Sequence, residues 1–299
     1  MLVSIRNKNS KGEKVFDTFN IILMVVLGIL FIYPVLNVLA ISLSGSSPIL
    51  RGEVTFFPKE FDMAGYKDVF ANKYIYISYA NTIFVAAVGC VLSLISISLA
   101  AYPMAYGDFY GKKLYTFMII FTMWFGGGMV PTYLVMSGLG LVGTHWALIL
   151  NFLMPAYYLI ILRSFFKSIP YALIESARLD GANDIVCLFK IVLPLSKPAL
   201  ATIALWVIVA HWNDFLNPLM YLNDQSMYTL QIVLNDIVLR ASGSLYELSD
   251  AVQAGDGTMT VPQQVQNAVI FVSMIPMLVV YPFVQKYFVK GVMIGSVKG

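Results

Sequence analysis

The segment that decides the fold spans residues 77–106 and reads ISYANTIFVAAVGCVLSLISISLAAYPMAY. It runs for 30 residues without Asp, Glu, Lys or Arg, and apolar side chains dominate it. A helix needs roughly 20 apolar residues to cross the hydrocarbon core of a bilayer. The segment therefore predicts a transmembrane helix.

The composition of the whole chain points the same way. Of its 299 residues, 59% are hydrophobic and only 12% are charged, and the mean hydropathy is +0.78. An average soluble domain is roughly 45–50% apolar and about 25% charged. This imbalance excludes a cytosolic enzyme, a disordered protein and a small disulfide scaffold, and it predicts an all-α polytopic membrane protein. A net charge of +3 provides no basic stripe for nucleic acid.

Six stretches are long and apolar enough to span a membrane, at residues 19–43, 77–106, 114–135, 146–162, 200–222 and 269–287. The first is preceded by a basic head, so a cleaved signal peptide is the alternative. Its apolar run is longer than a signal core and contains Pro34, which favours an uncleaved helix. The glycines at 126–128 and Pro131 break the third stretch, either as a bend or as the start of a loop.

Lysine and arginine predict the orientation. If the N-terminus is cytoplasmic, only five of the 19 Lys and Arg residues lie outside: Arg51, Lys59, Lys67, Lys73 and Arg240. Short loops rich in Lys and Arg stay on the cytoplasmic side. The sequence therefore predicts a multi-pass protein of the cell membrane with both termini in the cytoplasm.

The longest cytoplasmic stretch between two spans contains residues 168–198, SIPYALIESARLDGANDIVCLFKIVLPLSKP. Pro170 suits the first turn of a helix over 171–179, and Gly181 suits its end. Asn183 or Asp184 can cap a second helix, which Pro194 and Pro198 would stop. Ile185, Leu188, Phe189 and Val192 would form one apolar face of that second helix, and such an exposed face predicts docking into a groove of another protein.

This stretch resembles the Glu-Ala-Ala loop of the permease subunits of binding-protein-dependent ABC importers. That pattern is Glu-Ala-Ala, three residues, Gly, nine residues and Ile-x-Leu-Pro. Six of its seven specified positions match in this chain, namely Glu175, Ala177, Gly181, Ile191, Leu193 and Pro194. The one departure is Ser176, which stands where the pattern has its first Ala.

Other segments resemble the carbohydrate branch of that family. They are Leu-Asp-Gly-Ala at 179–182, Pro-Leu-Ser-Lys-Pro at 194–198, His-Trp-Asn-Asp-Phe-Leu-Asn-Pro at 211–218 and the C-terminal stretch 285–299, which is similar to the tail of maltose-type second permeases. Residues 125–133, FGGGMVPTY, look like permeases for complex oligo- and polysaccharides of Gram-positive bacteria.

The resemblance implies a type I importer fold and a division of labour. Two homologous permeases form the pore, an ATPase dimer binds ATP and Mg, and an extracellular sugar-binding protein or lipoprotein delivers the substrate, so this chain needs no cofactor of its own. The residues implied to couple to the ATPase are Glu175, Ser176, Ala177, Asp180, Gly181, Ala182, Ile191, Leu193 and Pro194, together with Val297, Lys298 and Gly299 of the tail.

Within this scheme the chain divides into three parts. Residues 1–76 contain the cytoplasmic head, the first transmembrane helix and the first outer loop. Residues 77–290 form a permease core with five helices, which includes the coupling loop at 163–198 and an acidic outer loop at 223–265. Residues 291–299 are a cytoplasmic tail. The outer loop is too long for a plain connector, so it is expected to have structure and a partner.

Polar residues near the end of the fifth span suggest a translocation path. His211 and Asp214 are three residues apart and are expected on one helix face, and ionisable groups at membrane depth face a cavity or a partner. The path would comprise His211, Trp212, Asn213, Asp214 and Asn217. The alternative is a buried polar lock between spans or a site near the outer interface.

The sequence gives less support to other functions. No phosphate-binding Gly-Lys loop, zinc-ligand spacing or Ser/His/Asp cluster indicates an enzyme, and Cys90 and Cys187 are too separated for a disulfide or a metal site. A secondary transporter usually shows an internal repeat and charged residues within its helices. A permease for a non-sugar solute remains the alternative within the ABC importers.

Overall fold

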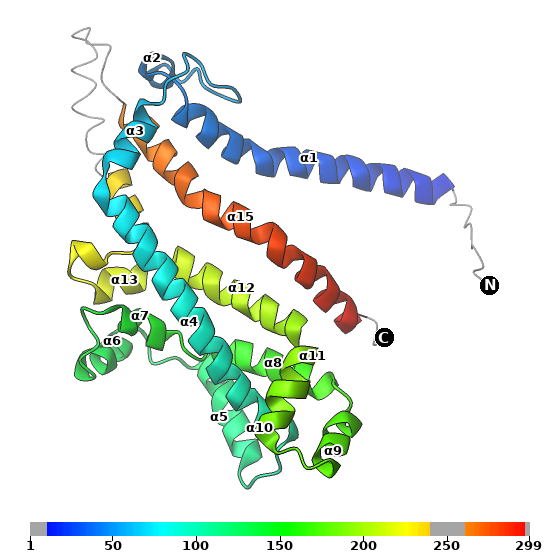
Figure 1. The fold of residues 1–299 in the computed structure, drawn as a ribbon. Helices are drawn as coiled ribbons and strands as arrows, with labels where there is room; N and C mark the ends of the chain where they lie inside the picture. Colours follow the sequence, from blue (N-terminus) through cyan, green and yellow to red (C-terminus); the bar gives the residue numbers. More distant parts are fainter. Residues whose placement is uncertain (1–10, 240–260, 297–299) are drawn as a thin grey trace. The chain divides into compact units, whose positions relative to one another are not determined.

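The computed structural model describes residues 11–239 and 261–296, and these are mainly helical (Figure 1). Within them the only β contact is an isolated bridge between Ser44 and Phe61. The described residues form two compact units. Unit 1 lies within 1–71 and 237–272, and unit 2 lies within 72–236 and 273–299.

The described helices cover all six stretches predicted to span the membrane. Two of them are each long and apolar enough alone, α1 (Lys11–Ser42) and α4 (Lys73–Tyr106). Among the described residues, up to five spans result if each of three bent helix pairs counts as one. The sixth predicted span lies within the long helix α15 (Pro262–Ser296).

The third predicted span is broken at its glycines, which confirms the predicted break. It divides into α5 (Lys112–Trp124) and α6 (Met129–Gly138), whose axes differ by 116°. Gly128 has φ +87° and ψ 175°, a conformation that is essentially restricted to glycine. The run of glycines is therefore a sharp bend.

The fourth and fifth predicted spans are also interrupted. The fourth consists of α7 (His145–Asn151) and α8 (Ala156–Ser168), bent by 49°, with Pro155 directly before α8. The fifth is shorter than predicted, because α12 (Lys197–Asn213) ends before Asp214. A separate short helix, α13 (Leu216–Tyr221), follows.

Unit 1 joins the end of α1 to two short helices and the start of α15. These are α2 (Ser46–Leu50) and α3 (Ala64–Ala71). Ala40, Ile49, Val54 and Val261 form its core. The apolar window of α1 itself has no buried side chain among the described residues, so most of its surface is available to lipid or to another subunit.

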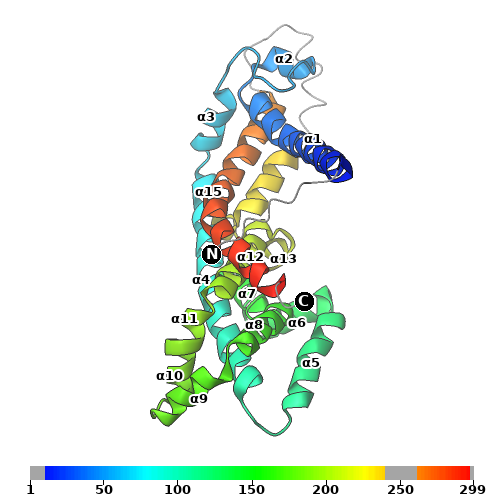
Figure 2. The same ribbon diagram turned by 90° about the vertical axis from the view of Figure 1, so that its right-hand side faces the viewer.

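Unit 2 is built around α4, which packs along both α8 and α12 (Figure 2). The shared core contains fully buried Ile97, Leu162, Phe166 and Val207. Gly89 of α4 faces His211 of α12, and a Cβ at that position would lie 2.5 Å from His211 Nε2. The absence of a side chain at Gly89 thus permits the two helices to approach closely.

Candidate functional site

The coupling loop forms two short helical arms at the end of α4 (Figures 1 and 2). The first arm is α9 (Tyr171–Leu179), which confirms the predicted helix. The second arm comprises α10 (Asp184–Cys187), a π-helical turn η1 (Leu188–Val192) and α11 (Leu193–Leu195). Asn183 caps this arm through its side-chain oxygen, which accepts from Val186 N at 2.9 Å.

The prediction that Pro194 and Pro198 stop the second arm is wrong for Pro194, whereas the arm does end before Pro198, at Leu195. Pro194 lies inside the second arm, directly after η1, and the chain stays helical around it. Pro198 lies at the start of α12, where the missing N–H of proline would have no intrahelical partner. The chain remains helical until Ser196, whose N–H reaches Val192 O at 2.9 Å. The bend of 81° between the second arm and α12 follows at this point.

Gly181 makes the turn between the arms. Its φ is +87°, the left-handed conformation that ends many helices. Ala182 N donates to Ala177 O at 2.9 Å and Gly181 N donates to Arg178 O at 3.0 Å, so two carbonyls at the end of α9 are satisfied. This is the Schellman arrangement, and it fixes the direction in which the chain leaves α9.

An ion pair joins the two arms and ties them to α4. Arg178 Nη2 donates to Asp184 Oδ1 at 2.7 Å, and the same oxygen accepts from Tyr102 Oη at 3.2 Å. The hydrogen bond from Arg178 lowers the pKa of Asp184 below its usual value. The inner sides of both arms are buried through Ile174, Cys187 and other members of the unit 2 core.

The outer surface of the loop is apolar with a carboxylate in it. Leu179 is 84% exposed, Ile185 is 67% exposed, and Phe189 is also exposed. The predicted single apolar face is therefore split, because Leu188 and Val192 turn into the core. Glu175 is exposed and takes part in none of the ion pairs found among the described residues.

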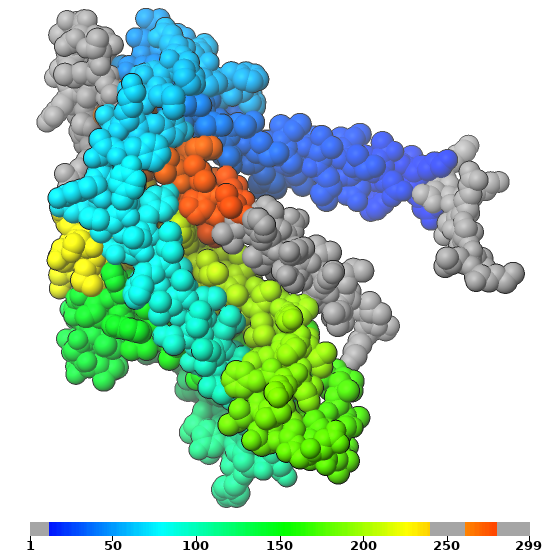
Figure 3. Space-filling model, in the orientation of Figure 1, coloured from blue at the N-terminus to red at the C-terminus, as the bar shows by residue number. Residues whose placement is uncertain are grey.

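The other residues of the pattern divide by burial. Ala177, Ala182, Ile191 and Leu193 are half-buried against the scaffold, whereas Ser176, Asp180, Gly181 and Pro194 are exposed. The space-filling view shows the loop on the surface of unit 2, in green and yellow-green (Figure 3). Val297, Lys298 and Gly299, and residues 240–260 of the predicted outer loop, lie outside the described residues.

The five residues predicted to line a translocation path do not form one group. The prediction that His211 and Asp214 share a helix face is wrong, because α12 ends at Asn213. His211 is buried against Gly89 and the ring of Phe152, with ring centroids 5.5 Å apart. Its Nε2 has no hydrogen-bond partner among the described residues.

Asp214 and Asn217 instead form a polar cluster with Asn151 of α7. Asn217 Nδ2 donates to Asp214 Oδ2 at 2.9 Å, and Asn217 Oδ1 accepts from Asn151 Nδ2 at 3.1 Å. Asn217 N also donates to Asp214 Oδ1 at 3.2 Å, which caps the first turn of α13. This geometry matches the alternative interpretation of Asp214, a polar lock between segments.

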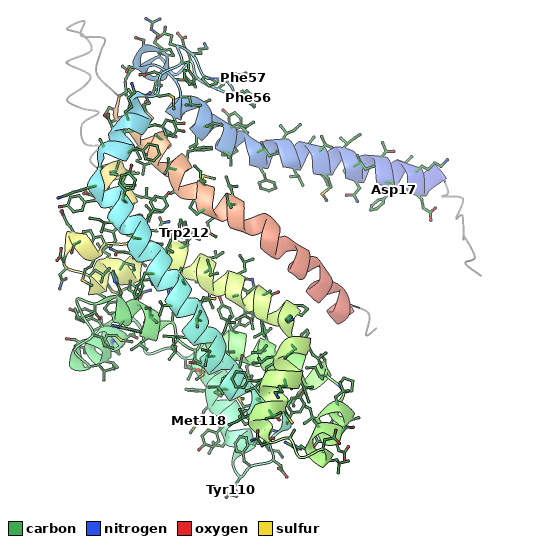
Figure 4. The ribbon with its side chains drawn as sticks, in the orientation of Figure 1. Asp17, Phe56, Phe57, Tyr110, Met118 and Trp212 are labelled. Atoms are coloured by element: carbon green, nitrogen blue, oxygen red, sulfur yellow. The ribbon has the colours of Figure 1, made fainter. Side chains whose placement is uncertain are left out.

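Trp212 and Asn213 border a cavity of about 730 Å³ in unit 2. Figure 4 marks Trp212 near the end of α12. Sequence reasoning missed most of the lining, including Tyr158, Trp206 and Gln231, because these residues lie far apart in the chain. Among the described residues, no group of three His, Cys, Asp or Glu side chains could hold a metal ion.

Comparisons with known proteins agree with this arrangement. The pattern of the family described as "Binding-protein-dependent transport system inner membrane component" matches residues 90–294. The chain is 39% identical over 287 residues to the polygalacturonan/rhamnogalacturonan transport system permease protein YtcP of Bacillus subtilis (strain 168), covering 96% of this chain and 99% of that protein. It is 40% identical over 295 residues to protein LplC of the same strain, covering 97% of each.

A solved structure shares the fold over nearly the full length. It is the crystal structure of a bacterial ABC transporter involved in the import of the acidic polysaccharide alginate. One of its chains has a TM-score of 0.84 and 34% identity, with 94% of this chain and 99% of that chain covered. The all-α fold is therefore that of an ABC importer permease. The chain belongs to the family of inner-membrane components of binding-protein-dependent transport systems.

Proposed function

We propose that this chain is a permease subunit of an ATP-driven importer that moves an oligosaccharide or polysaccharide fragment from an extracellular binding protein into the cytoplasm. The relatives named for polygalacturonan and alginate support the substrate class. The observation that carries the mechanism is the coupling loop, which exposes Glu175, Leu179 and Ile185 while its inner side chains are buried. ATP and Mg bind to the partner ATPases, and this chain is not an enzyme.

The exposed side chains of the coupling loop are suited to bind in a groove of the ATPase. Burying its exposed leucine, isoleucine and phenylalanine side chains in an ATPase groove removes apolar surface from water, at about 25 cal/mol per Å². Glu175 adds a charge that a basic group of the ATPase can pair with. The Arg178–Asp184–Tyr102 contacts connect the arms to α4, so a movement of the ATPase would be transmitted to a membrane helix.

Exposed apolar helices support contacts with a second permease and with the lipid bilayer. α5 has no buried side chain, and the apolar window of α1 has none. Both therefore offer surface to a second, homologous permease and to the lipid bilayer. The Lys and Arg pattern assigns both termini to the cytoplasm, where Val297, Lys298 and Gly299 would contact the ATPases.

Co-purification with its neighbours tests the proposal. The chain would be expressed with the permease, ATPase and binding protein encoded beside it. We expect a detergent-stable complex whose ATP hydrolysis rises when the sugar-loaded binding protein is added. Glu175→Ala removes the exposed charge, and Gly181→Pro cannot adopt φ +87°. Both changes should reduce the stimulation at least tenfold.

Asp108→Ala is the matched control, since Asp108 is an exposed carboxylate in the turn between α4 and α5, outside the coupling loop. It should retain the stimulation of the wild type. If no ATPase co-purifies, and if both coupling-loop variants behave like the wild type, the proposed function is wrong.

A further inference from the structure

The cavity in unit 2 lies between the second half of α12 and residues 273–278 of α15. Its volume of about 730 Å³ lies within the range of roughly 300–1,000 Å³ typical of small-molecule sites. Its lining comes from α8, α12, α15 and the helix Leu230–Leu239. The lining residues that matter below are Tyr158, Trp206, Trp212, Asn213, Gln231 and Ser273.

Aromatic rings form one wall. The ring of Trp206 lies 5.4 Å from that of Tyr158 and 6.1 Å from that of Tyr157, with planes inclined by 31° and 35°. Trp206 and Tyr158 are half-buried, so they are held in place while part of each ring borders the cavity. An aromatic face carries partial negative charge and attracts the partly positive C–H groups of a flat ligand. This wall is suited to stack against a sugar ring.

Amide side chains supply fixed polar groups beside the rings. Gln231 Nε2 donates to Trp212 O at 3.1 Å, and Asn213 Nδ2 donates to Val209 O at 3.0 Å. These bonds use one amide hydrogen each, so each amide retains an oxygen that can accept from a sugar hydroxyl. The side chain of Trp212 is itself supported by Tyr79, at a ring distance of 6.0 Å.

Among the described residues, the lining contains no Asp, Glu, Lys or Arg. A carboxylate brought into such a site would lose its hydration without gaining a cationic partner, which is unfavourable. An uncharged ring with hydroxyl groups fits both the aromatic wall and the amides, because its C–H face can stack on the rings and its hydroxyls can hydrogen-bond to the amide oxygens. The chemistry of this wall thus differs from that required to hold an acidic sugar.

We propose that this cavity is a sugar subsite of the permease, in which Trp206 stacks on an uncharged sugar ring and Asn213 and Gln231 bind its hydroxyls. The proposal rests on the proposed import function and adds that this subunit itself contacts the substrate. It also predicts the chemical class of the ring that is bound, a neutral sugar residue.

Transport by the complete importer in proteoliposomes tests this subsite. The probes are an α-1,4-linked galactose trisaccharide and the corresponding galacturonic acid trisaccharide, which share ring geometry and differ in charge. Uptake is read by mass spectrometry and ATP hydrolysis is measured in parallel. Trp206→Ala should lower uptake of the neutral probe at least tenfold, whereas Trp206→Phe should retain at least a third of the uptake.

Two further variants sharpen the test. Trp146→Ala removes a part-exposed tryptophan of α7 that is outside the lining, and it should leave uptake within twofold. Gln231→Lys adds a cation to the cavity wall and should raise the ratio of acidic to neutral uptake at least fivefold. This variant removes no packed ring, so it remains informative if Trp206→Ala fails to fold.

The outcomes are distinct. Uptake by Trp206→Ala that equals that of Trp146→Ala would overturn the subsite while the import function stands. If the wild type imports only the acidic probe, and if Gln231→Lys leaves the ratio of acidic to neutral uptake unchanged, the predicted preference of the subsite for a neutral ring is wrong. If the wild type imports neither probe and the binding protein does not stimulate its ATP hydrolysis, the proposed import function is wrong. The subsite proposal is then wrong as well.

Discussion

Arg178 and Asp184 are the residues through which the two arms of the coupling loop hold each other. Their side chains are largely exposed, so the pair should stabilise the fold by only about 0.2–1 kcal/mol. Its role is instead to hold α9 and α10 at a fixed angle to each other. We therefore expect Arg178→Gln to reduce binding-protein-stimulated ATP hydrolysis several-fold while changing thermal stability little. The exchanged pair, Arg178→Asp with Asp184→Arg, should recover part of that loss.

The same pair predicts a pH dependence. The hydrogen bond from Arg178 lowers the pKa of Asp184 in the folded protein, from an ordinary value of about 4. The pair thus contributes its full stability above that ordinary value and loses it as the pH falls through the lowered pKa. The difference in melting temperature between wild type and Arg178→Gln should be constant from about pH 5.5 to 8 and shrink only below about pH 4. A difference that changes near neutral pH would contradict this assignment.

At the scale of elements, the contact between α4 and α12 depends on Gly89. Because a Cβ there would lie 2.5 Å from His211 Nε2, Gly89→Ala forces the helices or the imidazole to move. Overpacking of this kind costs about 1–3 kcal/mol. We expect Gly89→Ala to lower the stability of the purified protein in detergent by this order, measured by thermal unfolding.

The double variant Gly89→Ala/His211→Ala separates this contact from a general loss of packing. Removal of the imidazole makes room for the new methyl group, so the two changes should couple by at least about 0.5 kcal/mol in the stabilising direction. Ser93→Ala is the control for α4, because Ser93 bonds to Phe152 O at 3.1 Å rather than to His211. Additive effects of the two changes at 89 and 211 would contradict the close contact.

The elements that the sequence predicted correctly are those with local signals. Pro170 and Gly181 mark the two ends of α9, and Asn183 marks the start of α10, because proline, glycine and asparagine act on their own turn of the backbone. The break of α12 before Asp214 was missed, since hydropathy averages over a window in which one aspartate has little weight. The cavity beside Trp206 was missed because its wall is assembled from residues 158, 206, 231 and 273, which only the folded chain brings together.

At the scale of the whole molecule, the predicted orientation rests on the distribution of Lys and Arg alone. The rule places the loop that contains Phe57 outside the cell and the turn that contains Tyr110 inside. Phe57 lies in the loop between α2 and α3 and is 81% exposed, and Tyr110 lies in the turn between α4 and α5 and is fully exposed (Figure 4). Cysteines at these two positions should therefore react readily with a maleimide that can reach them.

Labelling in whole cells can decide the orientation. Cys90 and Cys187 are buried and should contribute little background. With a membrane-impermeant maleimide, Phe57→Cys should be labelled in intact cells, whereas Tyr110→Cys should be labelled only after the membrane is opened. The reverse pattern would place the coupling loop outside the cell. A cytoplasmic ATPase could not reach it there, so this single result bears on both the topology and the proposed mechanism.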